Sequence, residues 1–180
     1  MNANSPTRRL SPVELMHELY AAEVRYISAG GAQAGADFSE MAACMHPDVV
    51  MHQGPSTPFP GDWVGISEVQ RFFSVLADTW SGMEINDIEY YEAGDALAMT
   101  MNGRLTSRAT GRTLEAAKCA QIITFKEGLI HDWTVFYLDP VGVLTACGID
   151  PGGREALVIR LLVDARNHRA RRQISSRGQD

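Results

Sequence analysis

The chain has 180 residues, of which 45% are hydrophobic and 21% are charged, and its net charge is −6. These values are typical of one soluble globular domain with a sizeable core. No run approaches the roughly 18 apolar residues of a membrane span, and residues 1–9 lack the apolar segment of a secretory signal. Three scattered cysteines (Cys44, Cys119 and Cys147) fit neither a disulfide framework nor a zinc site, which favours a reducing, cytoplasmic setting.

Charge is distributed unevenly along the chain. From Arg154 onward, seven arginines face three acidic residues, a balance of +4, so the rest of the chain carries −10. A nucleic-acid-binding domain usually concentrates basic charge on its folded body, so no nucleic-acid partner is expected. The Arg-rich end is predicted to be a solvated helix end or a docking segment for a partner subunit.

The first half of the domain reads as helical. Ser11, Pro12 and Glu14 form a capping signal, which predicts that an amphipathic helix begins there and runs to about residue 28. Small residues at 30–36 break it, a short helix over 37–45 follows, and a turn at 46–48 leads into a strand over 49–53. A proline-rich loop over 54–61 precedes a third helix over 65–80.

The second half of the domain reads as a sheet. Long strands are predicted over residues 83–91, 96–107, 112–126 and 129–138. Helices followed by strands indicate an α+β fold in which a curved antiparallel sheet wraps over about three N-terminal helices and encloses a cone-shaped hollow. The expected division is a flexible N-terminus over 1–10, the domain over 11–150, and a C-terminal helix with the Arg-rich tail over 151–180.

The hairpin over residues 122–139 is the most informative segment. Gly128 supplies the positive φ that its tight turn needs. Side chains alternate along the second strand, so His131, Trp133, Val135 and Tyr137 share one face, which suits the wall of a ligand cavity or an ordinary core. Asp132 faces the other way unless a local bulge shifts the register.

In the order of these features the chain resembles the nuclear transport factor 2-like superfamily, and within it the SnoaL-like group. The resemblance rests on the helix over 11–28, HPDVVMHQGPSTPFPGDWVG (46–65), the helix over 68–80, and ITFKEGLIHDWTVFYLD (123–139). It implies the cone-shaped α+β barrel. The group includes polyketide cyclases, ketosteroid isomerases, limonene-epoxide hydrolases and members without known catalysis, and the fold alone does not choose among them.

The resemblance places neither catalytic set of its best-known enzymes on this chain. Gln53 falls where ketosteroid isomerases carry their general-base aspartate, and a glutamine cannot take up a proton. The acid of their oxyanion hole matches Ala120 or Gln121, and their tyrosine matches Tyr26. The hydrolase residues fall at these positions: Met51, Gln53, Asn102, Arg104 and Val135. Chemistry by those two routes is therefore not expected.

Several residues remain candidates for acid–base chemistry or ligand binding. Gln53 is expected to point inward and orient a carbonyl or hydroxyl group, whereas His52 should face the opposite way. His131 is the inward acid–base candidate, with Asp132 as the alternative because the resemblance implies an aspartate in SnoaL-like cyclases. Tyr26 is expected to donate to a carbonyl oxygen.

The remaining candidates would shape or bind the ligand. Asn102 and Arg104 share a strand face, and Arg104 can instead pair with Glu115 at a rim. The other predicted ligand contacts, each of which can equally be a core residue, are His52, Met51, Trp63, Phe73, Gln121, Trp133, Val135 and Tyr137. The five histidines lack a metal-ligand spacing, so no metal and no other cofactor is expected.

These observations predict a cofactor-independent cyclase or isomerase. It would act by proton transfer on a hydrophobic, polyketide- or terpenoid-like small molecule in a dry cavity. The alternative is a noncatalytic ligand-binding or assembly module that uses the same cone. The resemblance also implies a homodimer through the open face of the sheet, and neither a membrane nor a nucleic acid is expected as a partner.

Overall fold

The computed structural model describes residues 10–153 and residue 161. Three helices precede most of the sheet: α1 (Pro12–Ser28), α2 (Ser39–Ala42) and α3 (Ile66–Thr79), with a 3-10 turn, η1 (Ala32–Ala34), between the first two. The capping box at the start of α1 is confirmed, because the Ser11 hydroxyl accepts from the Glu14 amide at 3.2 Å and the Glu14 carboxylate accepts from the Ser11 amide at 2.8 Å. None of the described helices is long and apolar enough to cross a membrane.

Seven strands form one curved sheet in the order β2-β1-β7-β6-β4-β3, with β5 paired to β4. Their bounds are β1 (Met45–Gln53), β2 (Gly61–Val64), β3 (Trp80–Ala93), β4 (Ala96–Ser107), β5 (Thr113–Leu114), β6 (Cys119–Lys126) and β7 (Leu129–Tyr137). All the pairs are antiparallel except β1 with β7, which is parallel. The predicted α+β fold is confirmed, and the sheet is mixed instead of purely antiparallel.

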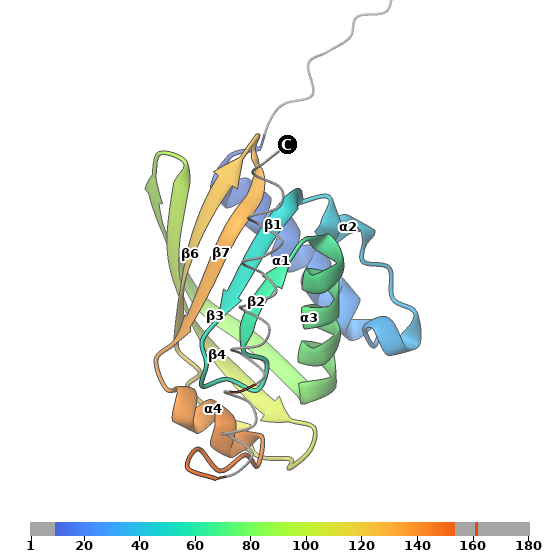
Figure 1. Ribbon diagram of the computed structural model, residues 1–180, viewed down its shortest axis with the longest axis vertical. Coiled ribbons are helices and arrows are strands. Elements are labelled where there is room, and N and C mark those ends of the chain that lie inside the picture. Colours follow the sequence, from blue (N-terminus) through green and yellow to red (C-terminus); the bar gives the residue numbers. More distant parts are fainter. Residues whose placement is uncertain (1–9, 154–160, 162–180) are drawn as a thin grey trace, which may run out of the picture.

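The helices cover one face of this sheet (Figure 1). α1 lies against β4, and α3 lies against β1 and β2. The buried core between them is rich in methionine and aromatic side chains, including Met16, Phe73 and Trp133. The apolar stripe of α1 and the alternation of the strands therefore bury the same interior, which is where a cavity can form.

The elements differ from the sequence prediction at four places, the first of which is the short strand β2, which was not predicted. The predicted turn at 46–48 lies within β1, where an irregular register between Met45 and Val50 accommodates Pro47. The long strand predicted over 112–126 is divided into β5 and β6. A helix that was not predicted, α4 (Pro140–Ala146), follows β7, and the Asp139 carboxylate caps it by accepting from the Gly142 amide at 2.8 Å.

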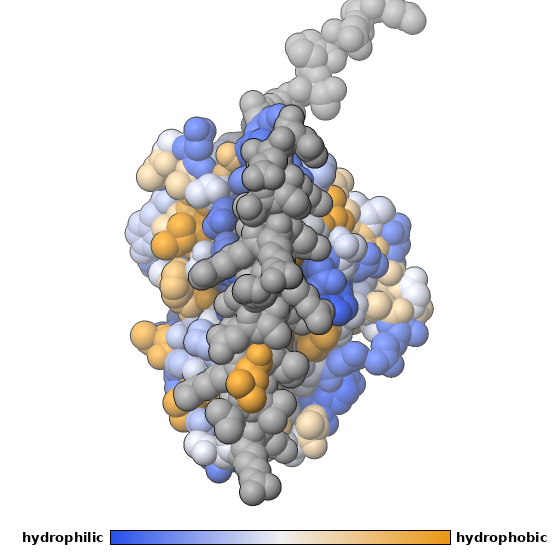
Figure 2. All heavy atoms as spheres, in the orientation of Figure 1, coloured by the Kyte–Doolittle hydropathy of each residue, from blue (hydrophilic) through white to orange (hydrophobic). Residues whose placement is uncertain are grey.

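The predicted C-terminal helix over 156–168, the Arg-rich tail and most of the flexible N-terminus lie outside the described residues. On the face shown in Figure 2, the apolar side chains of the described residues form separate groups among polar ones.

Candidate functional site

A cavity of about 80 Å³ lies between the concave face of the sheet and helices α1 and α3. A buried water needs about 10–15 Å³ on this scale, so the cavity holds roughly five to eight waters or a ligand of one or two rings. Most of its wall is apolar: Met51, Phe72, Phe73, Leu76, Met83, Ile85, Met101, Leu105, Trp133 and Val135. Methionine side chains adapt their shape easily, so this wall can accommodate different ligands.

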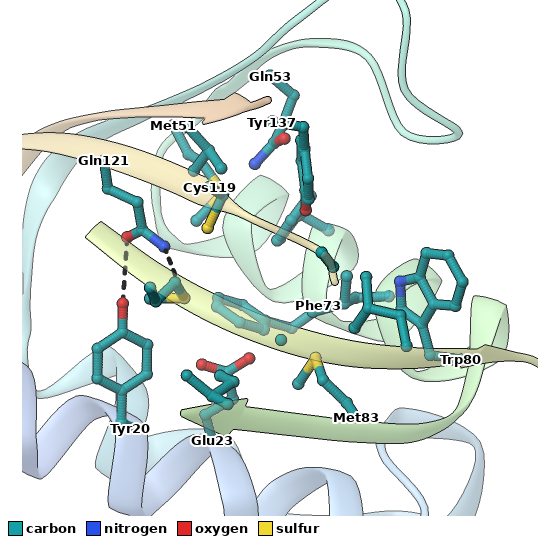
Figure 3. Close-up of a pocket in the computed structure, with 18 of the residues that line it drawn as sticks. Tyr20, Glu23, Met51, Gln53, Phe73, Trp80, Met83, Cys119, Gln121 and Tyr137 are labelled. Atoms are coloured by element: carbon teal, nitrogen blue, oxygen red, sulfur yellow. Dashed lines mark hydrogen bonds between the residues drawn. The ribbon is translucent and has the colours of Figure 1, made fainter. Parts of the chain in front are cut away.

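One carboxylic acid, Glu23, projects from α1 into this apolar cavity (Figure 3). Only 5% of the residue is exposed, and its carboxyl group has no hydrogen bond or ion pair with any described residue. Burial penalises the charged form and raises the pKa of Glu23 from 4.5 to about 7. Near neutral pH this group can therefore both accept and donate a proton.

A hydrogen-bonded group of three side chains lies beside Glu23. The Tyr20 hydroxyl donates to the Gln121 side-chain oxygen at 3.1 Å, and the Trp133 indole donates to the same oxygen at 2.8 Å. Both lone-pair directions of that oxygen are used, which fixes the carboxamide with its N–H₂ group on the other side. That group faces two sulfur atoms, the thioether of Met101 at 3.9 Å and the thiol of Cys119, both of which are weak hydrogen-bond acceptors.

Two further polar groups at the cavity are buried without a partner among the described residues. They are the side-chain oxygen of Gln53 and the indole nitrogen of Trp80. Buried polar groups are nearly always hydrogen-bonded, so such exceptions often mark sites where a ligand or water binds.

The phenols and the thiol of the cavity are neutral at physiological pH, and its second acid, Glu84, is largely exposed and pairs with Arg104 at 3.5 Å. Burial is the main cause that raises the pKa of the Tyr137 hydroxyl well above 10, and it raises the pKa of the Cys119 thiol to about 11. The nearby Glu23 adds to both shifts. Cys119 is therefore a poor nucleophile, whereas Tyr137 is suited to donate a hydrogen bond. Among residues 10–153, no group of three His, Cys, Asp or Glu side chains is arranged to hold a metal ion.

The sequence pattern of the SnoaL-like domain matches residues 25–133. The chain belongs to the SnoaL-like domain family. No curated protein matches this SnoaL-like chain in sequence.

Solved structures share the fold of this SnoaL-like protein. An NTF2-like protein from Burkholderia thailandensis is 22% identical with a TM-score of 0.63, over 76% of this chain and 97% of that one. A protein proposed to be a SnoaL-like polyketide cyclase, from a Jannaschia species, is 17% identical with a TM-score of 0.54, over 80% and 99%. TerC, co-crystallised with polyporic acid, is 16% identical with a TM-score of 0.56, over 73% and 98%. At identities of 16–22%, these matches show a shared fold and do not show a shared activity.

The cavity of the SnoaL-like protein contains seven of the residues that the sequence analysis proposed. They come from β1, α3, β6 and β7 and are Met51, Gln53, Phe73, Gln121, Trp133, Val135 and Tyr137. Strand alternation was sufficient to place those on β1 and β7 on the inward face.

Asp132 and His52 lie on the outer face of the sheet. The His52 ring bridges two carboxylates, with Asp62 at 2.6 Å and Asp132 at 3.1 Å. The hydrogen bond with Asp62 is the largest cause that raises the pKa of His52 from 6.5 to about 9, although burial opposes it. The Asp132 side chain is 44% exposed, so it is not the desolvated acid that was proposed as the alternative to His131.

His131 does not point into the cavity as strict alternation predicted. The register between β6 and β7 shifts there, because Thr124 pairs with Asp132 whereas Phe125 pairs with Ile130. This bulge turns Ile130 inward, where it is fully buried, and leaves His131 edge-on against His46 with 5.3 Å between ring centroids. The predicted alternative of a bulge is thus confirmed, yet the bulge turns neither acid–base candidate into the cavity.

The other predicted residues also lie outside the cavity wall. Tyr26 is buried with its hydroxyl 3.3 Å from the Ser74 hydroxyl, and Trp63 packs edge-on against Phe72 in the core. Asn102 and Arg104 share a face of β4, but it is the outer face. Asn102 donates to Asp87, and Arg104 donates to Glu115 at 2.9 Å, which confirms the alternative pairing for this arginine.

The sequence analysis missed Glu23 and Tyr20. Glu23 lies four residues after Leu19 and eight after Leu15, on the apolar stripe of α1. A charged residue in the middle of such a stripe is the signal that marks it, because Glu is almost never fully buried unless it is paired or functional. The tyrosine of α1 that lines the cavity is Tyr20. The predicted residue, Tyr26, lies further along the same helix and packs edge-on against Phe38.

Proposed function

We propose that the cavity binds a hydrophobic small molecule that carries a carbonyl group, and that Glu23 transfers a proton on it. The reaction would be a cyclisation or isomerisation of a polyketide- or terpenoid-like compound, and the present cavity volume favours its smaller members. The acid–base role that the sequence analysis gave to His131 and Asp132 thus passes to Glu23, because neither of those side chains lines the cavity.

The observation that carries the proposal is the buried, unpaired carboxyl group of Glu23 with its pKa raised to about 7. An acid or base is most effective when its pKa lies near the working pH. An isolated buried carboxylate also costs folding free energy, so its retention in an otherwise apolar interior favours a functional role. As a carboxylate, Glu23 would remove a proton from carbon, and as the acid it would return that proton.

The reaction also needs hydrogen-bond donors to the carbonyl oxygen, and the amides and phenols of the cavity can supply them. When a proton leaves the carbon next to a carbonyl group, negative charge develops on the carbonyl oxygen. The N–H₂ group of Gln121 and the Tyr137 hydroxyl are donors that can stabilise that oxygen in a site from which water is largely excluded. The proton transfer needs only groups of this chain.

Two of the proteins that share the fold support a small-molecule role. TerC was co-crystallised with polyporic acid, and the Jannaschia protein is proposed to be a polyketide cyclase. A noncatalytic binding module is the second candidate function. The observation that favours it is Gln53, an amide that cannot take up a proton at the position where the resemblance expects a base.

Proton exchange from carbon to solvent tests the proposal. We expect the wild-type protein in D₂O to accelerate deuterium incorporation next to the carbonyl of 4-phenylbutan-2-one, as followed by NMR. Glu23→Gln should reduce the acceleration by about a hundredfold or more, because a general base typically contributes that much. Glu18→Gln, which changes an exposed glutamate of the same helix, is the matched control and should keep the wild-type rate. Equal rates for all three proteins would contradict the catalytic role and favour the binding module.

We also propose that the protein is a homodimer through the outer face of its sheet. Ile122 and Phe136 are about half exposed on that face, at 49% and 51%. Both belong to the central strands β6 and β7, where a second copy could cover them.

A further inference from the structure

Two glutamines lie in one row across the centre of the sheet. Gln53 on β1 and Gln121 on β6 both pair with Val135 of the intervening strand β7. Neighbouring strands are about 4.8 Å apart, so the Cα atoms of the two glutamines are roughly 10 Å apart. Both residues are 94% buried, and their side chains line the cavity (Figure 3).

The two amides differ in how firmly they are held. Tyr20 and Trp133 both donate to the Gln121 oxygen, so this residue can offer only its N–H₂ group to a ligand. The Gln53 oxygen has no partner, and no described residue forms a hydrogen bond with its amide nitrogen. Gln53 can therefore turn and present either a donor or an acceptor.

We propose that Gln53 and Gln121 together select a 1,3-dicarbonyl ligand and bind one of its two oxygens each. In the keto form both oxygens accept hydrogen bonds, and both amides can donate. In the enol form one oxygen carries a hydrogen, which the turned Gln53 can accept, while the fixed Gln121 still donates to the remaining carbonyl. Tyr20 and Trp133 are positioning residues in this arrangement, because they act on the ligand through Gln121.

This substrate class also suits the acid in the cavity, and here the inference rests on the proposed function. The carbon between two carbonyls is far more acidic than the carbon beside one, because the charge of the enolate is shared by two oxygens. The C–H bond breaks, its electron pair is delocalised over both oxygens, and the proton moves to the Glu23 carboxylate, which returns it to carbon or oxygen. Two neutral amides match a charge that is spread in this way.

Three ligands with one carbon skeleton test the selection by calorimetric titration near pH 6. 1-Phenylbutane-1,3-dione carries both carbonyls. 1-Phenylbutan-1-one carries only the carbonyl beside the ring, and 4-phenylbutan-2-one carries only the other one. We expect the dione to bind about five- to tenfold more tightly than either monoketone, since each lacks one buried hydrogen bond. Equal binding of the three compounds, or no binding of any of them at millimolar concentration, would overturn the inference.

Three variants test whether Gln53 and Gln121 cause the preference for the dione. Gln53→Met keeps the side-chain size and leaves no group unpaired, and it should bind the dione no better than the monoketones. Gln121→Glu keeps an acceptor for Tyr20 and Trp133 but loses the N–H₂ group, and should reduce dione affinity about tenfold or more. Tyr20→Phe removes one of the two donors that fix Gln121 and should lower the dione-to-monoketone ratio about two- to fivefold. A full preference in Gln53→Met would contradict the role of the row.

Selection of the dione by the two amides and proton transfer by Glu23 can be tested independently of each other. Glu23→Gln should retain the preference for the dione although it loses proton exchange. If the dione is preferred but exchange does not depend on Glu23, the selection by the amides stands and the proposed function does not. If exchange depends on Glu23 but the dione has no advantage, only the inference about the amides is contradicted.

Discussion

Glu23 combines three properties at the scale of a single residue. It lies on the apolar stripe of α1, it has no partner among the described residues, and it faces a cavity whose wall is largely apolar. Removal from water favours the neutral acid, which is why the pKa of Glu23 rises to about 7. The same property that makes Glu23 useful for proton transfer makes it unfavourable for folding at high pH.

The stability of the fold should therefore decrease as the pH rises through the range in which Glu23 titrates. In the unfolded chain Glu23 loses its proton near pH 4.5, whereas in the folded chain it keeps the proton until about pH 7. The folded state binds more protons between these values, so its free energy of unfolding falls there, by roughly 3 kcal/mol in total. Glu23→Gln should remove this decrease.

Urea denaturation at pH 4.5, 6 and 8 measures the effect. We expect Glu23→Gln to be more stable than the wild type at pH 8 and nearly equal to it at pH 4.5. A stability difference that does not change with pH would show that the carboxyl group titrates near its ordinary value in the folded protein.

The inward residues of β1 and β7 could be predicted from the sequence, whereas the acid could not be found in the same way. Alternation placed Gln53, Trp133 and Val135 on the cavity side, because a strand has only two faces. The orientation of His131 was predicted wrongly because a bulge depends on how two strands pair, and the sequence of one strand does not determine that pairing. Glu23 was missed because only the apolar members of the α1 stripe were considered.

At the scale of elements, three neighbouring strands of the sheet bring together a charged cluster on the outer face, which consists of His52, Asp62 and Asp132. Register places His52 of β1 opposite Asp62 of β2 and diagonally beside Asp132 of β7. A hydrogen bond with Asp62 and a second one with Asp132 favour the protonated ring, so the pKa of His52 rises to about 9. The His52 ring therefore links β2 and β7 across β1, and this link is strongest while the ring is protonated.

His52→Asn should destabilise the protein below pH 6.5 and have little effect above pH 9. The protonated ring is favoured in the folded state, so its contribution is fully present below the unfolded pKa of 6.5 and is lost as pH rises through about 9. We expect a loss of about 1–2 kcal/mol at pH 6, since the ring is partly exposed. Urea denaturation at pH 6 and pH 9.5 compares the two, and an equal loss at both values would refute a charged ring.

The order of most elements followed from the sequence, but the parallel strand pairing and helix α4 did not. Capping signals predicted α1, and glycine marked the hairpin turn at Gly128 correctly, whereas Pro47 lies within β1 and not in a turn. The parallel pairing of β1 with β7 joins segments about 80 residues apart, which no local pattern specifies. The sequence did contain the cap of α4, Asp139 followed by Pro140, although it was interpreted only as the end of a strand.

At the scale of the whole molecule, the fold places the cavity on one face of the sheet and leaves Ile122 and Phe136 exposed on the other. If two copies pair through that outer face, Phe136→Glu should shift the protein from dimer to monomer in sedimentation velocity, because a buried unpaired charge is costly in an interface. Val24→Glu is the matched control, since Val24 is 61% exposed on α1, which lies on the opposite side of the sheet (Figure 1). A wild type that sediments as a monomer would contradict the dimer directly.

The pH dependence of proton exchange tests the central claim most directly. The rate at which the wild-type protein exchanges the protons next to the carbonyl of 4-phenylbutan-2-one should rise with a single midpoint near pH 7, as Glu23 becomes a carboxylate. This enzyme-dependent rise should be absent in Glu23→Gln. An identical profile in both proteins would show that the buried carboxyl group of the cavity is not the base.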